Sequence, residues 1–237
     1  MPDINQIFIL AAGRGERMRP VTDIIPKPLV KVNNKSLIDY IIEKVTILPK
    51  VNKIVVNAYY LAEIIEKHLK TLNNPKILLS KETEKLETGG GLLNALPLFD
   101  INKPILVINS DLIWNDKATE STALQLVINS FDEKRSDILL GVVPTGQFIG
   151  YEGVGDFYFD KSNNNLIKNH NLTHTFVGIQ IIHPRIFKNY PNPPFSLNYF
   201  YKNAVQSNGV LKRIKAVELK GQFFHVGTVD MLKRLNG

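Results

Sequence analysis

Short apolar runs alternate with amphipathic segments throughout the first half of this chain. The apolar runs have the length of buried β-strands and span residues 7–10, 54–57, 77–80, 105–108 and 138–143. Two segments between them, residues 36–45 and 61–72, repeat apolar side chains at helical spacing, and the first begins with a capping signal at Ser36. Strands that alternate with helices in this way predict an α/β fold built on a mostly parallel sheet.

The second half of the chain follows a different pattern. Residues 157–159 and 166–168 flank a turn of three asparagines and predict an antiparallel hairpin beside the sheet. The other expected elements are strands at residues 173–182, 214–219 and 223–226, a loop at 191–194 and a final helix from near Thr228. No repeat or low-complexity linker divides the sequence, so we expect a single domain over residues 1–237. Its fold class is α/β: a Rossmann-like, mostly parallel sheet flanked by helices, with an added antiparallel portion.

Composition excludes several classes of site and partner. The chain has no cysteine, which rules out disulfides and thiolate nucleophiles and leaves oxygen or imidazole as metal ligands. It shows no leader-like segment and no apolar stretch of membrane-spanning length, so we expect a cytoplasmic protein without a membrane partner. The net charge of +7 suits anionic small molecules, whereas the scattered lysines and the lack of a dense basic run argue against nucleic acid.

A glycine-rich turn follows the first predicted strand directly. It runs Leu10-Ala11-Ala12-Gly13-Arg14-Gly15-Glu16-Arg17-Met18-Arg19-Pro20. Ligands of open α/β sheets bind beyond the carboxyl ends of the strands, where glycines let backbone N–H groups approach phosphate oxygens. The turn is not a Walker A loop, because no Gly-Lys-Ser/Thr follows, and it is not a dinucleotide fingerprint, since Arg17 stands near the place of the last glycine. Taken alone, such a turn is equally compatible with a structural role.

A lysine held between two prolines favours the functional interpretation. In Pro26-Lys27-Pro28 the prolines fix φ and restrict the residues next to them. A solvated loop lysine needs no such constraint, whereas a lysine aimed at a phosphate does. The turn and Lys27 together predict a phosphate-binding site.

These segments resemble the signature of the sugar-1-phosphate nucleotidyltransferases, with residues 10–20, Thr22 and residues 26–30 matching in order and spacing. The resemblance implies that Arg17 binds the leaving phosphates and that Lys27 contacts the reacting phosphates. It also implies that the glycine-rich segment wraps the nucleotide, so the expected nucleotide-binding residues here are Leu10, Ala11, Ala12, Gly13 and Gly15.

A second glycine-rich segment, Leu86-Glu87-Thr88-Gly89-Gly90-Gly91-Leu92, opens a predicted helix. A helix N-terminus can present free N–H groups to a base or an anion, although three glycines also suit a flexible turn. In the family that the chain resembles, this loop reads the base and one edge of the sugar. The resemblance therefore implies base recognition by Thr88 and Gly89 and a sugar contact by Glu87.

A carboxylate follows the fourth apolar run, in Asn109-Ser110-Asp111. An aspartate at the carboxyl end of a central strand faces the ligand crevice and suits Mg²⁺, although a helix cap is the simpler alternative. The resemblance implies that Asp111 binds the metal. The usual glycine is replaced by Ser110, whose side chain crowds the approach of substrate.

The segment Phe224-His225-Val226-Gly227-Thr228 resembles a closing segment in which the family has an aspartate as second metal ligand. Here that position is His225. Because Mg²⁺ prefers hard oxygen ligands, a histidine suits Mn²⁺ better, so Mg²⁺ is the expected cofactor with Mn²⁺ as the alternative. The histidine leaves two interpretations open, an active enzyme or a nucleotide-sugar-binding regulatory protein with impaired catalysis.

Within the family, the pairing of the 86–91 segment with Asn-Ser-Asp-x-x-Trp most resembles the N-acetylmuramate-1-phosphate uridylyltransferases of peptidoglycan recycling. The implied partners are UTP and N-acetylmuramate-1-phosphate, and mannose-1-phosphate guanylyltransferase is the near alternative. Asp156 stands in a segment that resembles the border of the sugar pocket, although an aspartate before a strand is also an ordinary turn residue. The oligomeric state stays open.

Overall fold

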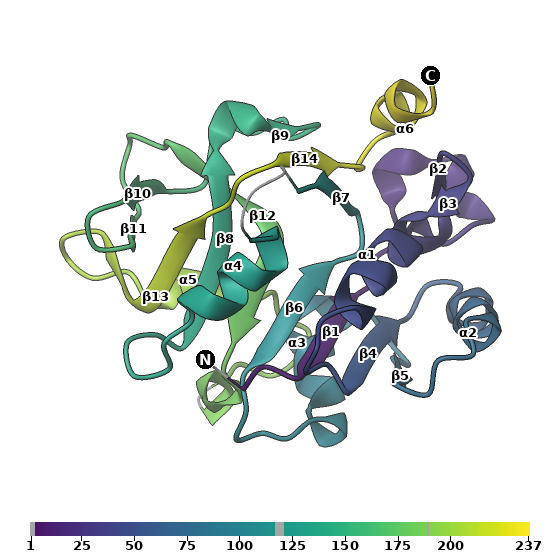
Figure 1. Cartoon of the computed structure of the whole chain (residues 1–237), viewed down its shortest axis with the longest axis horizontal. Coiled ribbons are helices and arrows are strands. Elements are labelled where there is room, and N and C mark those ends of the chain that lie inside the picture. Colours follow the sequence, from purple (N-terminus) through teal and green to yellow (C-terminus); the bar gives the residue numbers. More distant parts are fainter. Residues whose placement is uncertain (1–2, 117–120, 189) are drawn as a thin grey trace.

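The computed structural model describes residues 3–116, 121–188 and 190–237, and within them the main sheet has nine strands (Figure 1). Their order is β10-β11-β13-β8-β12-β6-β1-β4-β5. Four neighbours at one end pair in parallel, namely β5 (Ile77–Lys81), β4 (Lys53–Ala58), β1 (Gln6–Leu10) and β6 (Ile105–Asn109). The predicted α/β fold with a mostly parallel sheet is confirmed.

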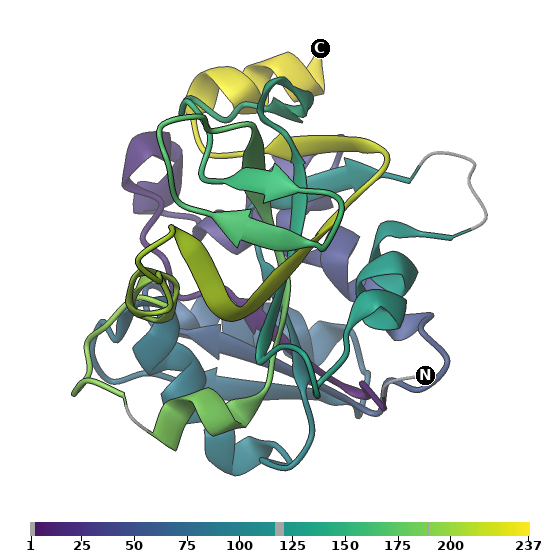
Figure 2. The same ribbon diagram turned by 90° about the vertical axis from the view of Figure 1, so that its left-hand side faces the viewer.

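The other end of the sheet is mixed. Strand β12 (His174–Ile182) lies antiparallel between β6 and β8 (Ile138–Pro144), and β13 (Val210–Glu218) runs parallel to β8. The hairpin of β10 (Tyr158–Asp160) and β11 (Asn165–Ile167) completes this edge by pairing antiparallel with β13 (Figure 2). The hairpin expected around the three asparagines is therefore confirmed, whereas the insertion of β12 into the sheet carried no sequence signal.

Both faces of the sheet are buried, as the near-continuous apolar runs of a parallel sheet require. In β1, Ile7 and Ile9 join one apolar cluster and Phe8 joins the other, and none of the three is exposed to solvent. The apolar cluster that contains Ile7 and Ile9 also includes buried side chains from α1 (Leu37–Thr46), α2 (Ala62–Thr71) and α4 (Ala123–Ser130). The cluster that contains Phe8 includes buried side chains from α3 (Glu87–Ala95) and α5 (Asn198–Asn203). Both predicted helices of the first half are confirmed, and Ser36 Oγ caps α1 by accepting the Asp39 N–H.

A smaller sheet lies at the carboxyl end of β6 (Figure 1). It joins β7 (Leu112–Asn115), β14 (Gln222–His225) and β9 (Phe148–Ile149), and β14 runs antiparallel to β7. The last helix, α6 (Val229–Asn236), follows β14 and is capped by Thr228 Oγ1, which accepts the Met231 N–H. A separate two-stranded hairpin consists of β2 (Lys31–Val32) and β3 (Lys35–Ser36). The sequence predicted β14 and α6, but it did not predict β7 or β9.

No helix in the described part of the chain combines the length and the apolar character that crossing a membrane requires.

Candidate active site

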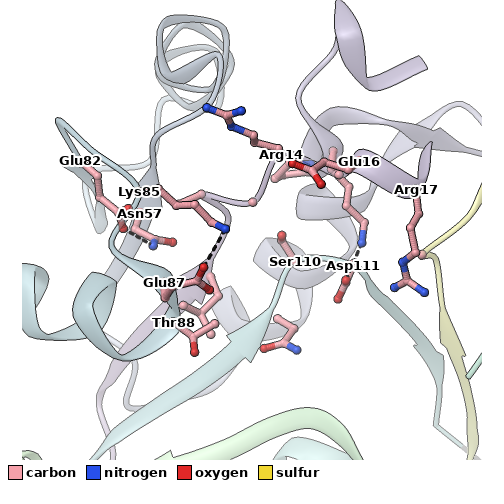
Figure 3. Close-up of a pocket in the computed structure, with 18 residues that line it drawn as sticks. Arg14, Glu16, Arg17, Asn57, Glu82, Lys85, Glu87, Thr88, Ser110 and Asp111 are labelled. Atoms are coloured by element: carbon pink, nitrogen blue, oxygen red, sulfur yellow. Dashed lines mark hydrogen bonds and ion pairs between the residues drawn. The ribbon is translucent and has the colours of Figure 1, made fainter. Parts of the chain in front are cut away.

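A cavity of about 450 Å³ opens at the carboxyl ends of the parallel strands (Figure 3). Leu10, Asn57 and Asn109 reach it from the ends of β1, β4 and β6. Most of the predicted site residues line this cavity, namely Leu10, Ala12, Gly13, Gly15, Arg17, Lys27, Glu87, Thr88 and Asp111. The topology explains the clustering, because parallel strands bring their carboxyl ends to one edge of the sheet.

Four predicted residues do not line the cavity. Ala11 is buried beneath the glycine-rich turn, and its N–H donates to Asn57 Oδ1 at 2.7 Å. His225 stands next to the cavity, against Asp111, whereas Gly89 and Asp156 are engaged elsewhere in the protein. Their predicted roles are taken up below with their contacts.

The glycine-rich turn has two glycines in different settings. Gly15 has a φ of +66°, and a Cβ there would lie 2.9 Å from Lys27 Cβ and 2.9 Å from Thr22 Cγ2. Thr22 also donates its hydroxyl to the Gly15 carbonyl at 2.8 Å. By contrast, no atom lies within 4 Å of a Cβ built on Gly13, which faces the open cavity. Gly15 therefore packs the turn onto Lys27, and Gly13 leaves room for a ligand.

Lys27 and Asp111 form the closest charged contact in the cavity. Lys27 Nζ lies 2.6 Å from Asp111 Oδ2, and the side chains are only 13% and 23% exposed. Burial alone would raise the pKa of Asp111, but the positive charge of Lys27 and a hydrogen bond with His225 outweigh it and hold the pKa far below its ordinary value. Asp111 is therefore an anion throughout the neutral range.

His225 reaches Asp111 because β14 pairs with β7. The register places His225 opposite Leu112, and Val226 N donates to the Asp111 carbonyl at 2.9 Å. His225 Nε2 then lies 3.3 Å from Asp111 Oδ2, and Nδ1 lies 3.3 Å from the Gly150 carbonyl. The predicted metal pair is thus adjacent in space, although its residues are 114 apart in sequence.

The donor set for a metal is small. Within residues 3–116, 121–188 and 190–237, no group of three or more His, Asp or Glu side chains is arranged to hold a metal ion. One carboxylate together with substrate phosphates is nevertheless a common arrangement for Mg²⁺. Asp111 fits that arrangement, and His225 adds an imidazole beside it.

Arg17 lines the cavity from the first turn after Gly15. Its guanidinium lies 3.7 Å from Glu152 Oε2, and both side chains are largely exposed. A Cβ on Gly227 would lie 3.0 Å from Arg17 Nη2, so the arginine also packs closely on the segment that follows His225. An exposed ion pair at this distance contributes little free energy and leaves the guanidinium open to a stronger anion.

The beginning of α3 is closed by another segment of the protein. The N–H groups of Gly89 and Gly90 both donate to the Phe195 carbonyl, at 2.9 and 3.0 Å. A Cβ on Gly89 would lie 2.4 Å from the Phe195 ring, so only glycine fits there. Thr88 lines the cavity, but its Oγ1 accepts the Leu197 N–H at 2.9 Å. The Gly89 N–H thus has a partner within the protein, and the absence of a side chain at Gly89 allows close packing on Phe195. Base recognition by Thr88 and Gly89 stays a prediction.

Asp156 lies in a second, smaller cavity of about 220 Å³, next to β12 and α5. Its Oδ2 accepts the Phe176 N–H at 2.9 Å and its Oδ1 accepts the Tyr151 hydroxyl at 3.3 Å. Both carboxylate oxygens thus have partners within the protein. The sugar contact predicted for Asp156 stays a prediction. The contacts of its carboxylate are those expected of an ordinary turn residue, which was the alternative that the sequence left open.

Sequence reasoning missed a buried polar link below the cavity. Asn57 Nδ2 donates to Glu82 Oε1 at 2.6 Å, and both residues line the cavity although each is at most 5% exposed. Burial raises the pKa of Glu82, partly offset by its hydrogen bonds with Asn57 and the Leu86 backbone. Asn57 is the last residue of the predicted strand 54–57, and Glu82 comes two residues after the predicted strand 77–80. Their position at strand ends was the signal that could have found them.

Other cavity residues also went unassigned. Arg14 lies over the Tyr59 ring, 5.9 Å from its centroid, and Lys85 forms an ion pair with Glu87. Further unassigned residues that line the cavity are Glu16, Pro28, Asn109 and Gly227.

Comparison with known proteins identifies a family and relatives of the chain. The family model described as nucleotidyl transferase matches residues 7–158. The chain is 34% identical over 229 residues to N-acetylmuramate alpha-1-phosphate uridylyltransferase of Caulobacter vibrioides, covering 93% of this chain and 90% of that protein. It is 36% identical over 110 residues to the mannose-1-phosphate guanylyltransferase catalytic subunit beta of Danio rerio, which covers 45% of this chain and 30% of that protein.

A solved structure with the same fold is the inositol-1-phosphate CTP transferase from T. maritima. Its TM-score is 0.76 at 15% identity, with 98% of this chain and 96% of that chain covered. The match extends the agreement to the mixed part of the sheet beyond residue 158. On the family model and the full-length relative together, the chain belongs to the nucleotidyl transferase family, and the predicted enzyme class, sugar-1-phosphate nucleotidyltransferase, is confirmed.

Proposed function

We propose that the protein transfers a uridylyl group from UTP to N-acetylmuramate-1-phosphate, producing a nucleotide sugar and pyrophosphate. The observation that carries this proposal is the contact between Lys27 and Asp111 beneath an open glycine-rich turn. The similarity of 93% of the chain to an N-acetylmuramate alpha-1-phosphate uridylyltransferase supports the choice of substrates. The proposed setting is a single domain in the cytoplasm, without nucleic acid or membrane partners. Peptidoglycan recycling is the corresponding process.

The proposed reaction needs no nucleophile from the protein. An oxygen of the sugar phosphate attacks the α-phosphorus of the triphosphate, the new P–O bond forms, and the bond to the β-phosphate oxygen breaks. Lys27 holds the reacting phosphates. Arg17 releases its ion pair with Glu152 and binds the leaving pyrophosphate, because a phosphate anion is the stronger partner of a guanidinium. Positioning and charge neutralisation then account for catalysis.

Asp111 is the proposed ligand of Mg²⁺, with His225 beside it. The hydrogen bonds from described side chains to this carboxylate fall on Oδ2, which leaves Oδ1 for a cation. When bound, Mg²⁺ would neutralise charge on the substrate phosphates. The imidazole favours Mn²⁺ as the alternative ion.

Two other functions have an observation in their favour. The match to a guanylyltransferase supports GTP and mannose-1-phosphate as substrates. The histidine at position 225 supports a regulatory protein that binds nucleotide sugars and turns over poorly.

Pyrophosphate release tests all three functions. Purified protein would be assayed with each ribonucleoside triphosphate against N-acetylmuramate-1-phosphate, mannose-1-phosphate and other sugar-1-phosphates, in Mg²⁺ and in Mn²⁺. Release with UTP and the muramate substrate is the expected result, and Arg17→Ala should reduce it. Release only with GTP and mannose-1-phosphate would establish the guanylyltransferase. Ligand binding without release under any condition would establish the regulatory protein.

A further inference from the structure

The side chain of Asn57 joins two walls of the cavity. Its Oδ1 accepts the Ala11 N–H at 2.7 Å, where the glycine-rich turn begins, and its Nδ2 donates to Glu82 Oε1 at 2.6 Å, just beyond β5. Asn57 and Ala11 are each 1% exposed and Glu82 is 5% exposed, so both hydrogen bonds are buried. Figure 3 shows Asn57 and Glu82 together on the side of the cavity away from Arg17. The proposed reaction gives no role to this link of Ala11, Asn57 and Glu82.

The sheet places Asn57 between the two groups that it joins. Strand β4 lies between β1 and β5, and Asn57 stands next to its last residue, Ala58. The turn follows β1 and Glu82 follows β5, so one side chain from the middle strand reaches both. The Glu82 N–H also donates to the Ala58 carbonyl at 2.8 Å, which holds Glu82 against the end of β4. Strand pairing therefore sets the position of the link.

The amide of Asn57 has one orientation that satisfies both partners. A backbone N–H only donates hydrogen bonds, so the amide oxygen must face Ala11, and the amide nitrogen then faces Glu82. The reverse orientation would set two donors against each other at Ala11 and two acceptors against each other at Glu82. Because both contacts are buried, a mismatch at either end is costly. Glu82 thus fixes Asn57, and Asn57 fixes Ala11.

Helix α3 closes over the link through Gly91. A Cβ at this position would lie 2.6 Å from Glu82 Oε1 and 2.8 Å from Asn57 Nδ2, which is too close for any side chain. The third glycine of the 89–91 run therefore leaves room for the hydrogen bond between these two residues. The glycine-rich turn, the end of β5 and α3 all meet at Asn57.

The hydrogen bond to Asn57 sets the direction of the turn. It points the Ala11 N–H into the protein, whereas the next four residues, 12–15, line the cavity. Within the part of the chain that the structure describes, the N–H groups of residues 12–15 donate to no acceptor of the protein. Free N–H groups of successive residues form a concave site for phosphate oxygens, and their direction depends on the backbone of the turn. Loss of the Ala11 contact therefore changes where these groups point.

We propose that Asn57 is a positioning residue for the substrate phosphates, on which it acts through the Ala11 N–H and the shape of the glycine-rich turn. Glu82 holds the Asn57 amide in place, in addition to lining the cavity. Neither side chain needs to touch a phosphate, because the turn carries the effect. This inference rests on the proposed function for the presence of phosphates at the turn.

Exchanging the donor and the acceptor of the link tests this role. Asn57→Asp replaces the amide nitrogen by an oxygen, so two carboxylates face each other, and their repulsion displaces the group that accepts the Ala11 N–H. Adding Glu82→Gln to this variant restores one donor and one acceptor in reverse order, because the glutamine amide donates to the new carboxylate. The double variant also keeps the net charge of the unmodified protein, since one carboxylate is gained and one is lost.

Titration calorimetry with inorganic pyrophosphate and with UTP, both in Mg²⁺, provides the measurement. Work at about pH 8.5 keeps a shared proton from bridging the two carboxylates of Asn57→Asp. We expect this variant to raise both Kd values at least about tenfold, because the buried contact is lost and the turn moves. The double variant should return both values to within about threefold of the unmodified protein. Pyrophosphate lacks a base, so a matching loss for both ligands places the effect at the phosphates.

Asn94→Asp is the matched control, because it makes the same exchange of an amide for a carboxylate on α3, outside the cavity. Asn94 Nδ2 donates to Ser80 Oγ at 3.3 Å, so this variant also loses a donor to a residue of β5. It should bind both ligands as the unmodified protein does. Urea unfolding establishes that each variant is folded.

Unchanged pyrophosphate binding in folded Asn57→Asp would overturn the inference. Weaker binding of UTP alone would do the same, since it would place the effect of the link at the nucleoside. A double variant that folds but does not recover pyrophosphate binding would show that Glu82 acts on the ligand itself, which would also overturn the inference. If Asn57→Asp does not fold, the double variant alone makes this last test.

The proposed function fails on a different measurement. Loss and recovery of pyrophosphate binding as expected, without pyrophosphate release from any substrate pair, would contradict the transferase activity and leave the inference standing. Absence of pyrophosphate binding by the unmodified protein would overturn the inference, whereas the release assay would still decide the function.

Discussion

Lys27 Nζ and Asp111 Oδ2 lie 2.6 Å apart, so the lysine assigned to the reacting phosphates and the carboxylate assigned to the metal are each other's partners before substrate enters. The contact keeps two charges neutralised in a half-buried place. When substrate binds with a divalent cation, the substrate phosphates can replace Asp111 as the anionic partner of Lys27, and the cation can replace Lys27 as the cationic partner of Asp111. The cavity is therefore preorganised for a negatively charged ligand that arrives with a cation.

Lys27→Met removes the cation and leaves Asp111 without its closest partner. We expect kcat to fall by about 100-fold, because one preorganised charge on the reacting phosphates is lost. The pKa of Asp111 should rise for the same reason. Pyrophosphate release measures the first effect. Lys212→Met, which removes an exposed charge outside the cavity, should turn over normally. Normal turnover in both variants would contradict the role of Lys27.

His225→Asp places a second carboxylate beside Asp111 and tests the metal assignment. We expect lower Mg²⁺ concentrations to support half-maximal activity, and we expect the ratio of Mn²⁺-supported to Mg²⁺-supported rates to fall, since imidazole suits Mn²⁺ better than Mg²⁺. His225→Asn, which changes shape without adding charge, should show neither effect. If the aspartate variant kept the metal response of the unmodified protein, His225 would not belong to the metal site.

Gly15→Ala and Gly13→Ala test two different roles of glycine in the same turn. Gly15 allows close packing on Lys27, and Gly13 leaves space for a ligand. A methyl group on Gly15 would meet Lys27 and Thr22 at a φ of +66°, so we expect a loss of about 1–2 kcal/mol in the free energy of unfolding and a lower kcat. A methyl group on Gly13 meets nothing, so stability should be kept while the KM for the triphosphate rises. Urea unfolding and steady-state kinetics make the two measurements. Equal effects of the two substitutions would contradict the arrangement of the turn.

Asp137 is held between two arginines away from the cavity, with Arg185 Nε at 2.5 Å and Arg213 Nε at 2.8 Å. Burial would raise its pKa, but the hydrogen bonds from the arginines outweigh burial and lower the pKa below the ordinary 3.8. A lowered pKa stabilises the fold above the ordinary value, and this contribution disappears as the pH falls through the pKa of the folded state.

Asp137→Asn should therefore cost about 2 kcal/mol of unfolding free energy at pH 7, where the carboxylate of the unmodified protein is ionised. The difference between the two proteins should shrink below about pH 4. Urea unfolding across this range provides the measurement. A difference that stayed constant with pH would show that the ionised carboxylate is not the source of the stability.

Local patterns in the sequence were sufficient for much of the fold. The apolar runs at residues 7–10 and 54–57 are short and bounded by polar segments, so their strands could be located, and Ser36 marked the start of α1. The short strands β7 and β9 lacked such a signal, because they gain their pairing partner only from β14, more than 70 residues later in the chain. A two-residue strand has no periodicity of its own.

The sequence by itself determined the α/β class, the glycine-rich turn and the constrained Lys27, because each depends on neighbouring residues and on backbone preferences that act locally. Tertiary structure alone decided that His225 stands 3.3 Å from Asp111 and that Phe195 closes the start of α3. Those contacts join residues roughly a hundred positions apart, and sheet pairing and loop packing, rather than any local preference, fix which distant groups meet.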